Sequence, residues 1–482
     1  MSNPSKKDIF REWLFHQKTE NLSRRNFLAN AGAGAAATVF LPSILSLLTR
    51  PSISQAASPF NPFVVFDCVG GGTFAREVLP LDQTLSYLSP TAYASAGLPV
   101  GFDARATGAV IETFGAPIPS ASILAKALTG GAAAPNINAS AAVRASLKIM
   151  TVCNPTVVDD NSNATIPSNQ AAALAASLGS GMSVPSGVSD TNSNSGAKRG
   201  LASQVVAGYK PAQAASLTAI QGLTSLKQGA LSSLSDAQMG AMVNMSAKLT
   251  VEQKEMLSKM TLGKELGTIA EAAGQANIAK VANATTFDGR NDTLIAGAYG
   301  INGNTLAFLN NNPNTPNPVV TVATQVKLLT DGFAPVMVKS LDGFDYHDGT
   351  ATTWKARHLE LINQTMQMLN AFAAKGVPVM IQWNTDGATR NNGEISQGDG
   401  SQNHSSVVFV LSMNGAPAPK SFQIGAFTSG GAASSTTPVA GSATNEGHAI
   451  FANLAAFQGK PVPASLMPTG LNPDLFNSFK LF

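Results

Sequence analysis

The sequence predicts an α/β fold, because apolar strands alternate with a long helix in its C-terminal half. The runs at 335–341, 377–383 and 406–411 are short and apolar, as buried strands are. A helical pattern at 354–375 separates the first two runs, and the order strand, helix, strand is typical of a parallel crossover unit. In open sheets of this kind the ligand lies beyond the carboxyl ends of the strands.

Two more strands are expected earlier in the chain. An apolar run at 63–66 leads into Asp67 and a glycine-rich turn, and a run at 147–152 ends at Cys153. The turn is either a phosphate cradle or a plain tight turn, since neither the dinucleotide spacing nor the phosphate-loop spacing is present. Cys68 and Cys153 both stand at strand ends, and the sequence leaves open whether they form a disulfide or remain buried thiols.

The body of the protein is predicted to be one α/β domain, 57–482, with two interruptions. Residues 156–200 are rich in Ser, Asn, Gly and Asp, which predicts a polar surface loop with one short Ala-rich helix near 170–178. Residues 201–283 have a helical pattern with few aromatic side chains, which predicts a helical insertion packed over or beside the sheet. Residues 461–482 are expected to form an irregular tail.

Residues 1–56 have the order of a twin-arginine signal peptide. Arg24 and Arg25 precede an apolar run at 29–48, and a small-x-small cleavage site follows at 54–56. We therefore expect a periplasmic or otherwise exported protein that meets the twin-arginine translocase during export. The alternative is a membrane anchor, because about twenty apolar residues can span a bilayer.

The charge balance argues against nucleic acid as a partner. The formal net charge is +3, but residues 1–56 hold seven Lys/Arg and three Asp/Glu, which leaves 24 basic and 25 acidic residues in the rest of the chain. A chain so near neutrality has no general electrostatic attraction for nucleic acid or anionic lipid. We expect no nucleic-acid partner and no permanent membrane span.

Potential metal ligands gather in loops at one end of the predicted sheet. The candidate ligands are carboxylates and imidazoles near strand ends. They are Asp67, after the first strand, and Asp345, His347, Asp386 and His404, in three later loops. Hard divalent cations prefer oxygen ligands, whereas zinc takes His with carboxylate, so zinc, manganese or calcium would suit this set. The alternative is that these Asp residues form turns and the His residues cap loops. His358 is assigned to the surface or to packing, and His448 to a structural role near a helix N-terminus.

Several of these segments resemble a known family. The segment Gly-Phe-Asp-Tyr-His at 343–347, the helix that follows it and the loops that lead to His404 are similar to a twin-arginine-exported family known only as domain of unknown function fifteen-oh-one. That family is grouped with the alkaline phosphatase and sulfatase-like superfamily. The resemblance covers most of 60–415. It implies a doubly wound three-layer α/β/α sandwich (alkaline-phosphatase-like) with an inserted helical region, and hydrolysis of phosphate or sulfate esters at one or two metal ions.

The resemblance also has departures. Asp345 and His347 match the family's Gly-x-Asp-x-His segment, Asp386 with Arg390 falls at an acidic-Phe-Gly-Arg motif, and His404 matches the His of an Asp-His pair. In this chain Asn403 replaces the Asp of that pair, and no His stands near 168–169, where the family often has one. Each departure removes a potential ligand.

Two functions follow from the sequence. The first is a metal-dependent phosphatase or sulfatase-like hydrolase, with Thr73 as the best-placed nucleophile and Arg390 beside the phosphoryl or sulfuryl group. The second is a non-catalytic envelope protein with a degenerate hydrolase fold, which binds a glycan or a protein partner. The hydrolase is the leading hypothesis, and the missing ligands support the second function.

Overall fold

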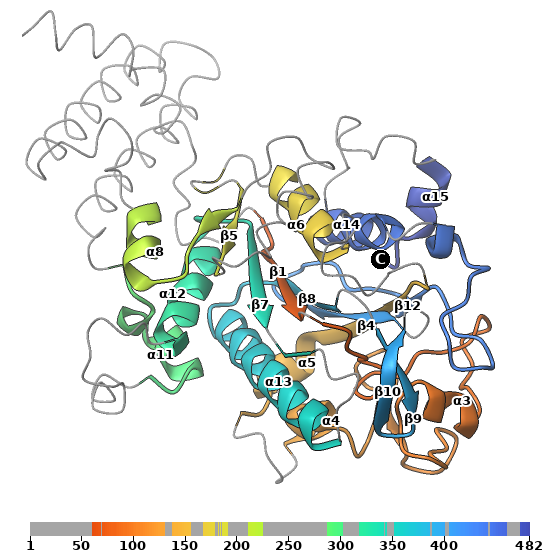
Figure 1. Ribbon diagram of the computed structural model, residues 1–482. Coiled ribbons are helices and arrows are strands. Elements are labelled where there is room, and N and C mark those ends of the chain that lie inside the picture. Colours follow the sequence, from red (N-terminus) through yellow and green to blue (C-terminus); the bar gives the residue numbers. More distant parts are fainter. Residues whose placement is uncertain are drawn as a thin grey trace, which may run out of the picture.

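A central eight-stranded mixed sheet organises the computed structural model (Figure 1). The structure describes residues 60–68, 70–130, 137–155, 167–178, 182, 184, 186–190, 211–224, 287–301, 318–341, 343–344, 351–385, 388–400, 404–441, 444–459 and 473–482. In spatial order the strands are β12 (Gln423–Ile424), β4 (Leu147–Cys153), β11 (Ser405–Leu411), β8 (Val379–Thr385), β1 (Phe63–Cys68), β7 (Val336–Leu341), β5 (Val188–Ser189) and β6 (Ala212–Gln213). β1, the first strand of the described residues, thus lies inside the sheet.

One strand runs against the others. β1 is parallel to both β7 and β8, β5 is parallel to β7 and β6, and β12 is parallel to β4. β11 is antiparallel to both of its neighbours, β4 and β8. The start of β11 therefore lies at the edge of the sheet where β4, β8, β1 and β7 end.

Helices cover both faces of the sheet, as in a three-layer α/β/α arrangement (Figure 1). On one face lie α4 (Ile123–Thr129), α5 (Ala141–Ser146), α8 (Leu217–Thr224), α11 (Thr293–Ala298), α12 (Pro318–Thr330) and the long α13 (Ala351–Ala374). On the other face lie α6 (Pro167–Leu178), α14 (Thr444–Phe457) and the short α15 (Pro473–Ser478). This confirms the α/β class.

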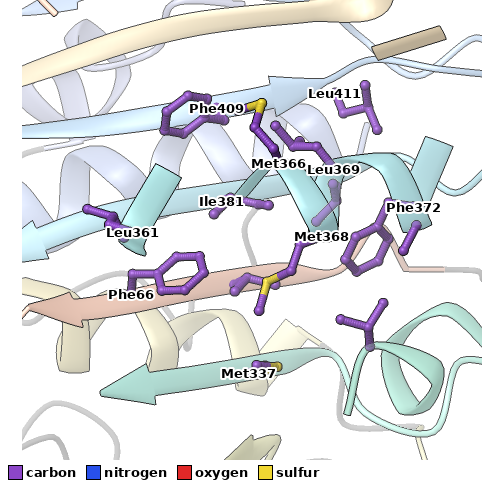
Figure 2. Close-up of a cluster of buried hydrophobic side chains, with 14 of the residues drawn as sticks. Phe66, Met337, Leu361, Met366, Met368, Leu369, Phe372, Ile381, Phe409 and Leu411 are labelled. Carbon is purple, nitrogen blue, oxygen red and sulfur yellow. The ribbon is translucent and has the colours of Figure 1, made fainter. Parts of the chain in front are cut away.

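The strands are apolar throughout because both of their faces are buried. Along β1, Val64 and Phe66 face the α13 side, whereas Phe63 and Val65 face the α6 and α14 side. Figure 2 shows the α13 side, where the methionine and aromatic side chains of the helix lie over apolar residues of β1, β7, β8 and β11. Such two-sided burial produces continuous apolar runs and not the alternation of a half-exposed strand.

Smaller elements surround the carboxyl edge. A hairpin of β9 (Ala388–Asn392) and β10 (Ile395–Gly400) follows β8, and β2 (Val110–Ile111) pairs with β3 (Ile118–Pro119). The helix α3 (Pro90–Ser95) lies against β9. The described residues also form the 3-10 helices η4 (Gly289–Asn291) and η6 (Pro438–Gly441).

The main expected elements are confirmed within a few residues of their bounds. The three C-terminal runs are β7, β8 and β11, the earlier runs are β1 and β4, and the predicted helix is α13. The crossover unit is parallel, but β1 lies between β7 and β8. The residues after β8 that were expected as a loop extend into β9.

The polar segment 156–200 requires a correction. Within it, α6 packs on β1, β7 and β8 with Ala171, Ala172 and Ala175 fully buried, and β5 pairs with β7 in the central sheet. The prediction of a surface loop is wrong for these two elements. An Ala-rich helix suits this position because small side chains let a helix approach a sheet closely.

Other expectations are tested only where the structure describes the chain. Of the expected helical insertion 201–283, residues 211–224 are described, and they contain the edge strand β6 as well as α8. The C-terminal segment includes α15, and Phe479 after it is buried against α14. The predicted signal peptide, 1–56, lies outside the described residues. Among the described helices, none combines the length and the apolar character needed to cross a membrane.

The two cysteines are both buried, and neither forms a disulfide. Cys68 pairs in register with Thr385, and Cys153 pairs with Ser405, so β8 and β11 lie between the two cysteines. Three strand spacings of roughly 4.8 Å place their Cα atoms about 14 Å apart, about twice the limit for a disulfide. Burial, with the nearby Glu446 carboxylate, also raises the pKa of the Cys153 thiol far above its usual range.

We expect both thiols to be free in the purified protein. Alkylation in denaturant without a reductant should add two labels per chain. Alkylation of the folded protein should add almost none, because burial excludes the reagent and keeps Cys153 protonated, and the thiol form is unreactive. Mass spectrometry distinguishes the two states. Failure to label the denatured chain before reduction would contradict the strand order.

Candidate functional site

The carboxyl edge of the sheet brings together polar residues that are far apart in the sequence. β1, β4 and β8 end there at Cys68, Cys153 and Thr385, and the reversed β11 begins there at Ser405. His404 therefore lies at the same edge as Asp67, as predicted. The reason is the antiparallel direction of β11, which the apolar run alone does not reveal.

The structure describes part of the predicted ligand set. Asp345 and His347, which follow β7, and Asp386, which follows β8, lie outside the described residues. Arg390 lies in β9, but its side chain is outside the described part.

A row of polar side chains crosses the sheet just inside this edge. Asp67 on β1 pairs in register with Ser340 on β7 and with Asn384 on β8. Ser406 on β11 continues the row, and its Oγ lies 2.7 Å from Asn384 Oδ1. Asp67 is 2% exposed, and Asn384 and Ser406 are fully buried. Asp67 and Ser406 each stand two positions along their strand from an apolar residue that faces α6 and α14, Val65 and Val408 respectively, so the polar row lies under that helical layer.

Glu446 reaches the row from the first turn of α14. Its Oε1 and Oε2 lie 3.1 Å and 3.0 Å from His404 Nε2, and both side chains are fully buried. Ser406 Oγ contacts the same carboxylate and also Asn384, so its single proton serves one acceptor at a time. A buried carboxylate needs such partners, and the N-terminal end of a helix favours negative charge.

This arrangement fits part of a metal site. Metal-binding histidines commonly donate the second ring N–H to a carboxylate, which is the contact His404 makes with Glu446. A metal at His404 would therefore bind Nδ1. Within the described residues, however, no three His, Cys, Asp or Glu side chains come close enough to hold an ion. The described donors Asp67 and His404 would need ligands from the loops after β7 and β8.

The glycine-rich turn after β1 is tied to β8. Thr385 Oγ1 accepts from Gly72 N at 3.1 Å and also contacts the carbonyl of Gly70. Gly70 has φ +106°, which a side chain rarely tolerates. The Gly72 N–H is thus used within the protein, which favours a plain tight turn over a phosphate cradle.

Thr73 is fully buried, and its hydroxyl donates to the Ala96 carbonyl at 3.3 Å. A nucleophilic hydroxyl is normally activated by an adjacent base. The contact to a carbonyl oxygen holds the Thr73 proton in a structural hydrogen bond.

Arg76 and Glu77 were not singled out from the sequence. Both contact side chains of α13, Trp354 and His358 respectively. Arg76 is 4% exposed, lies 4.5 Å from the centre of the Trp354 ring and donates to Asn391 Oδ1 at 2.7 Å. Glu77 Oε1 lies 3.0 Å from His358 Nδ1, and both side chains are 1% exposed. His358 is therefore a packing residue and not a surface residue. Burial lowers its pKa, although the Glu77 carboxylate opposes that shift.

Glu446 is the main residue at this edge that sequence reasoning missed. It stands in Asn445-Glu446-Gly447-His448, and of this segment the sequence-based interpretation considered the histidine alone. His448 lies in the second turn of α14, is 8% exposed, and burial lowers its pKa to about 4. The sequence feature that could have indicated Glu446 was an acidic residue in the first turn of a largely apolar helix. A favourable interaction with the helix N-terminus explains such a residue equally well.

The chain was compared with known proteins in three ways. Family models, curated proteins and solved structures all give no match to it.

Proposed function

We propose that this protein is a divalent-metal-dependent hydrolase of small phosphate or sulfate esters, with its site at the carboxyl edge of the sheet. The observation that carries the proposal is the fully buried contact between His404 and Glu446, at the same edge as Asp67. Histidines that bind metals usually donate their other ring N–H to a carboxylate, a backbone carbonyl or a water. The sequence resemblance to the alkaline-phosphatase-like superfamily supports the same reading.

In this proposal the metal ligands are Asp67, Asp345, His347, Asp386 and His404. A bound divalent ion would activate a water or hydroxyl nucleophile and neutralise charge on the ester. Arg390 would stabilise negative charge on the phosphoryl or sulfuryl oxygens. We assign the nucleophile to water or to a hydroxyl other than Thr73, because Thr73 is buried and bonded to a carbonyl. The protein would act after twin-arginine export, in the periplasm.

One observation favours the second function, a non-catalytic envelope protein that binds a glycan or a protein. The buried side chains of Asn384, Ser406, Glu446 and His404 contact one another at this edge. Such a network can remain as a structural element after metal ligands are lost.

Metal analysis separates the two functions. The native mature protein is expected to hold zinc, manganese or calcium in a fixed ratio to the chain, and to hydrolyse an aryl phosphate or aryl sulfate. His404→Ala and Asp386→Ala should each lose at least tenfold in metal affinity, because an incomplete ligand shell must be refilled by water. Glu360→Ala, an exposed carboxylate on α13, serves as the control and should keep the metal.

Elemental analysis and thermal melting with and without a chelator give the readout. A native protein that carries no divalent metal, and melts identically with chelator, would rule out the hydrolase and leave the binding function.

A further inference from the structure

We propose that a surface cavity beside the sheet binds a zwitterionic amino acid with an apolar side chain. The cavity has a volume of about 420 Å³. Its walls include Leu81, Leu85, Tyr87, Arg105, Glu112 and Pro117. Small-molecule sites have volumes of about 300–1,000 Å³, so this space suits one amino acid better than a nucleotide or a larger cofactor.

The cavity lies along the side of the sheet, away from the carboxyl edge. Gly115, which lines it, forms a bridge with Ile149 of β4. Ile149 stands roughly 13 Å along β4 before Cys153, where the carboxyl edge begins. Binding in this cavity is therefore independent of the proposed hydrolase site.

The walls of the cavity are anchored to the sheet and to each other. Gln423 of β12 accepts from the Leu81 N–H at 2.8 Å and donates to the Leu81 carbonyl at 2.9 Å. The Leu79 N–H donates to the Pro117 carbonyl at 2.8 Å. A cavity with such fixed walls loses little conformational entropy when a ligand binds.

Two groups of opposite charge line the cavity without pairing with each other. Arg105 Nη1 donates to the Leu88 carbonyl at 3.0 Å, and its Nη2 contacts the Tyr87 carbonyl. A guanidinium has five N–H donors, so three remain for a ligand. Glu112 Oε1 accepts from the Tyr87 hydroxyl, and Oε2 remains an acceptor. Among the ion pairs of the described residues, none includes Arg105 or Glu112.

Tyr87 separates these two charges, because Arg105 lies at its carbonyl and Glu112 at its hydroxyl. Burial, with the Glu112 carboxylate, raises the pKa of Tyr87 far above its usual range, so the hydroxyl keeps its proton and donates. A ligand that lies along Tyr87 can place a carboxylate at Arg105 and an ammonium at Glu112. Guanidinium groups bind carboxylates in a bidentate manner. An α-amino acid carries both required charges.

Leu85 supplies an apolar part of the wall that the fold itself does not require. Its φ is +58°, a conformation that favours Gly or Asn over a bulky residue, and its side chain is 55% exposed. The loop holds it there, because Asp82 Oδ1 accepts from the N–H groups of Thr84 at 2.8 Å and Ser86 at 2.9 Å. An exposed leucine gains little from packing within the protein. Its place in the cavity wall points to contact with the apolar side chain of a ligand.

Isothermal titration calorimetry of the purified protein with L-leucine and L-phenylalanine tests the proposal. Arg105→Gln and Glu112→Gln should each weaken binding at least tenfold, because each removes a charge-assisted hydrogen bond. To the native protein, L-leucinamide, which lacks the carboxylate, and isocaproate, which lacks the ammonium, should bind at least tenfold more weakly than L-leucine. Arg357→Gln, on the exposed side of α13, is the control and should bind as the native protein does.

Leu85→Asn separates binding from folding. Asparagine tolerates the left-handed conformation, so the melting temperature should stay the same or rise, whereas affinity for L-leucine should fall about fivefold with the loss of the apolar contact. Val100→Ala is the matched control, because Val100 is 77% exposed and does not line the cavity. That variant should keep the native affinity.

Three results would overturn the proposal. The first is no measurable binding of either amino acid at millimolar concentration. The second is binding of isocaproate or inorganic phosphate as tight as that of L-leucine and unchanged in Glu112→Gln, which would show an anion site only. The third is equal affinity of the native protein and Leu85→Asn, which would remove the apolar contact from the site. Each of these results leaves the metal content, and with it the hydrolase proposal, untouched.

Discussion

Replacing Glu77 with leucine is expected to lower the free energy of unfolding by about 3–5 kcal/mol. The carboxylate lies 3.0 Å from His358 Nδ1 and accepts from the Leu124 backbone N–H at 2.9 Å, so it links α13 to the first turn of α4. Both side chains of the Glu77–His358 contact are almost fully buried, and leucine would leave two buried donors without an acceptor. Urea denaturation followed by circular dichroism measures the loss.

Glu77→Gln is the matched variant for this prediction. The amide oxygen can still accept one of the two hydrogen bonds, so the loss should be about half that of Glu77→Leu. Equal stability of the native protein and Glu77→Leu would show that the link between α13 and α4 contributes nothing.

Acid is expected to destabilise the protein through His448. Burial lowers the pKa of this residue from 6.5 to about 4. In the unfolded chain His448 binds a proton below about pH 6.5, whereas in the folded protein it does so only below about pH 4. Stability is therefore complete above pH 6.5 and falls as the pH decreases from 6.5 to 4, by about 3 kcal/mol in total from this residue.

His448→Leu isolates that contribution, because leucine does not titrate. The loss of stability between pH 6.5 and 4 should be about 3 kcal/mol smaller in the variant than in the native protein, when both are measured by denaturation at each pH. His358 shifts in the same direction and remains in both proteins, so it cancels in the difference. Parallel pH profiles would contradict the prediction.

The elements that the sequence predicted well are those with strong local patterns. β1, β7, β8 and β11 are continuous apolar runs, and α13 has a long helical period. The direction of β11 could not be predicted, because an apolar run reads the same whichever way the strand lies in the sheet. The helix α6 was predicted near 170–178, but its burial and the strand β5 were missed, because small and polar residues carry little hydrophobic signal; Ala171, Ala172, Ala175, Val188 and Ser189 are fully buried.

The positions of two candidate residues were predicted. Asp67 and His404 were expected at one edge, and the structure places both there. Glu446 was not expected, since its contact with His404 depends on α14 folding back over β11, and no local pattern encodes that contact. Thr73 was expected to present its hydroxyl, but the turn after β1 buries it against Ala96.

The central place of β1 has a consequence for synthesis on the ribosome. Phe63 pairs with Val336 on one side and with Met380 on the other, so β1, the first described strand, leaves the ribosome well before either of its partners. At roughly 5–20 residues per second, the nascent chain carries an unpaired apolar strand for tens of seconds. Sheets built from such distant segments fold slowly and expose aggregation-prone edges meanwhile. The protein should therefore depend on a chaperone that holds its N-terminal third until translation is nearly complete.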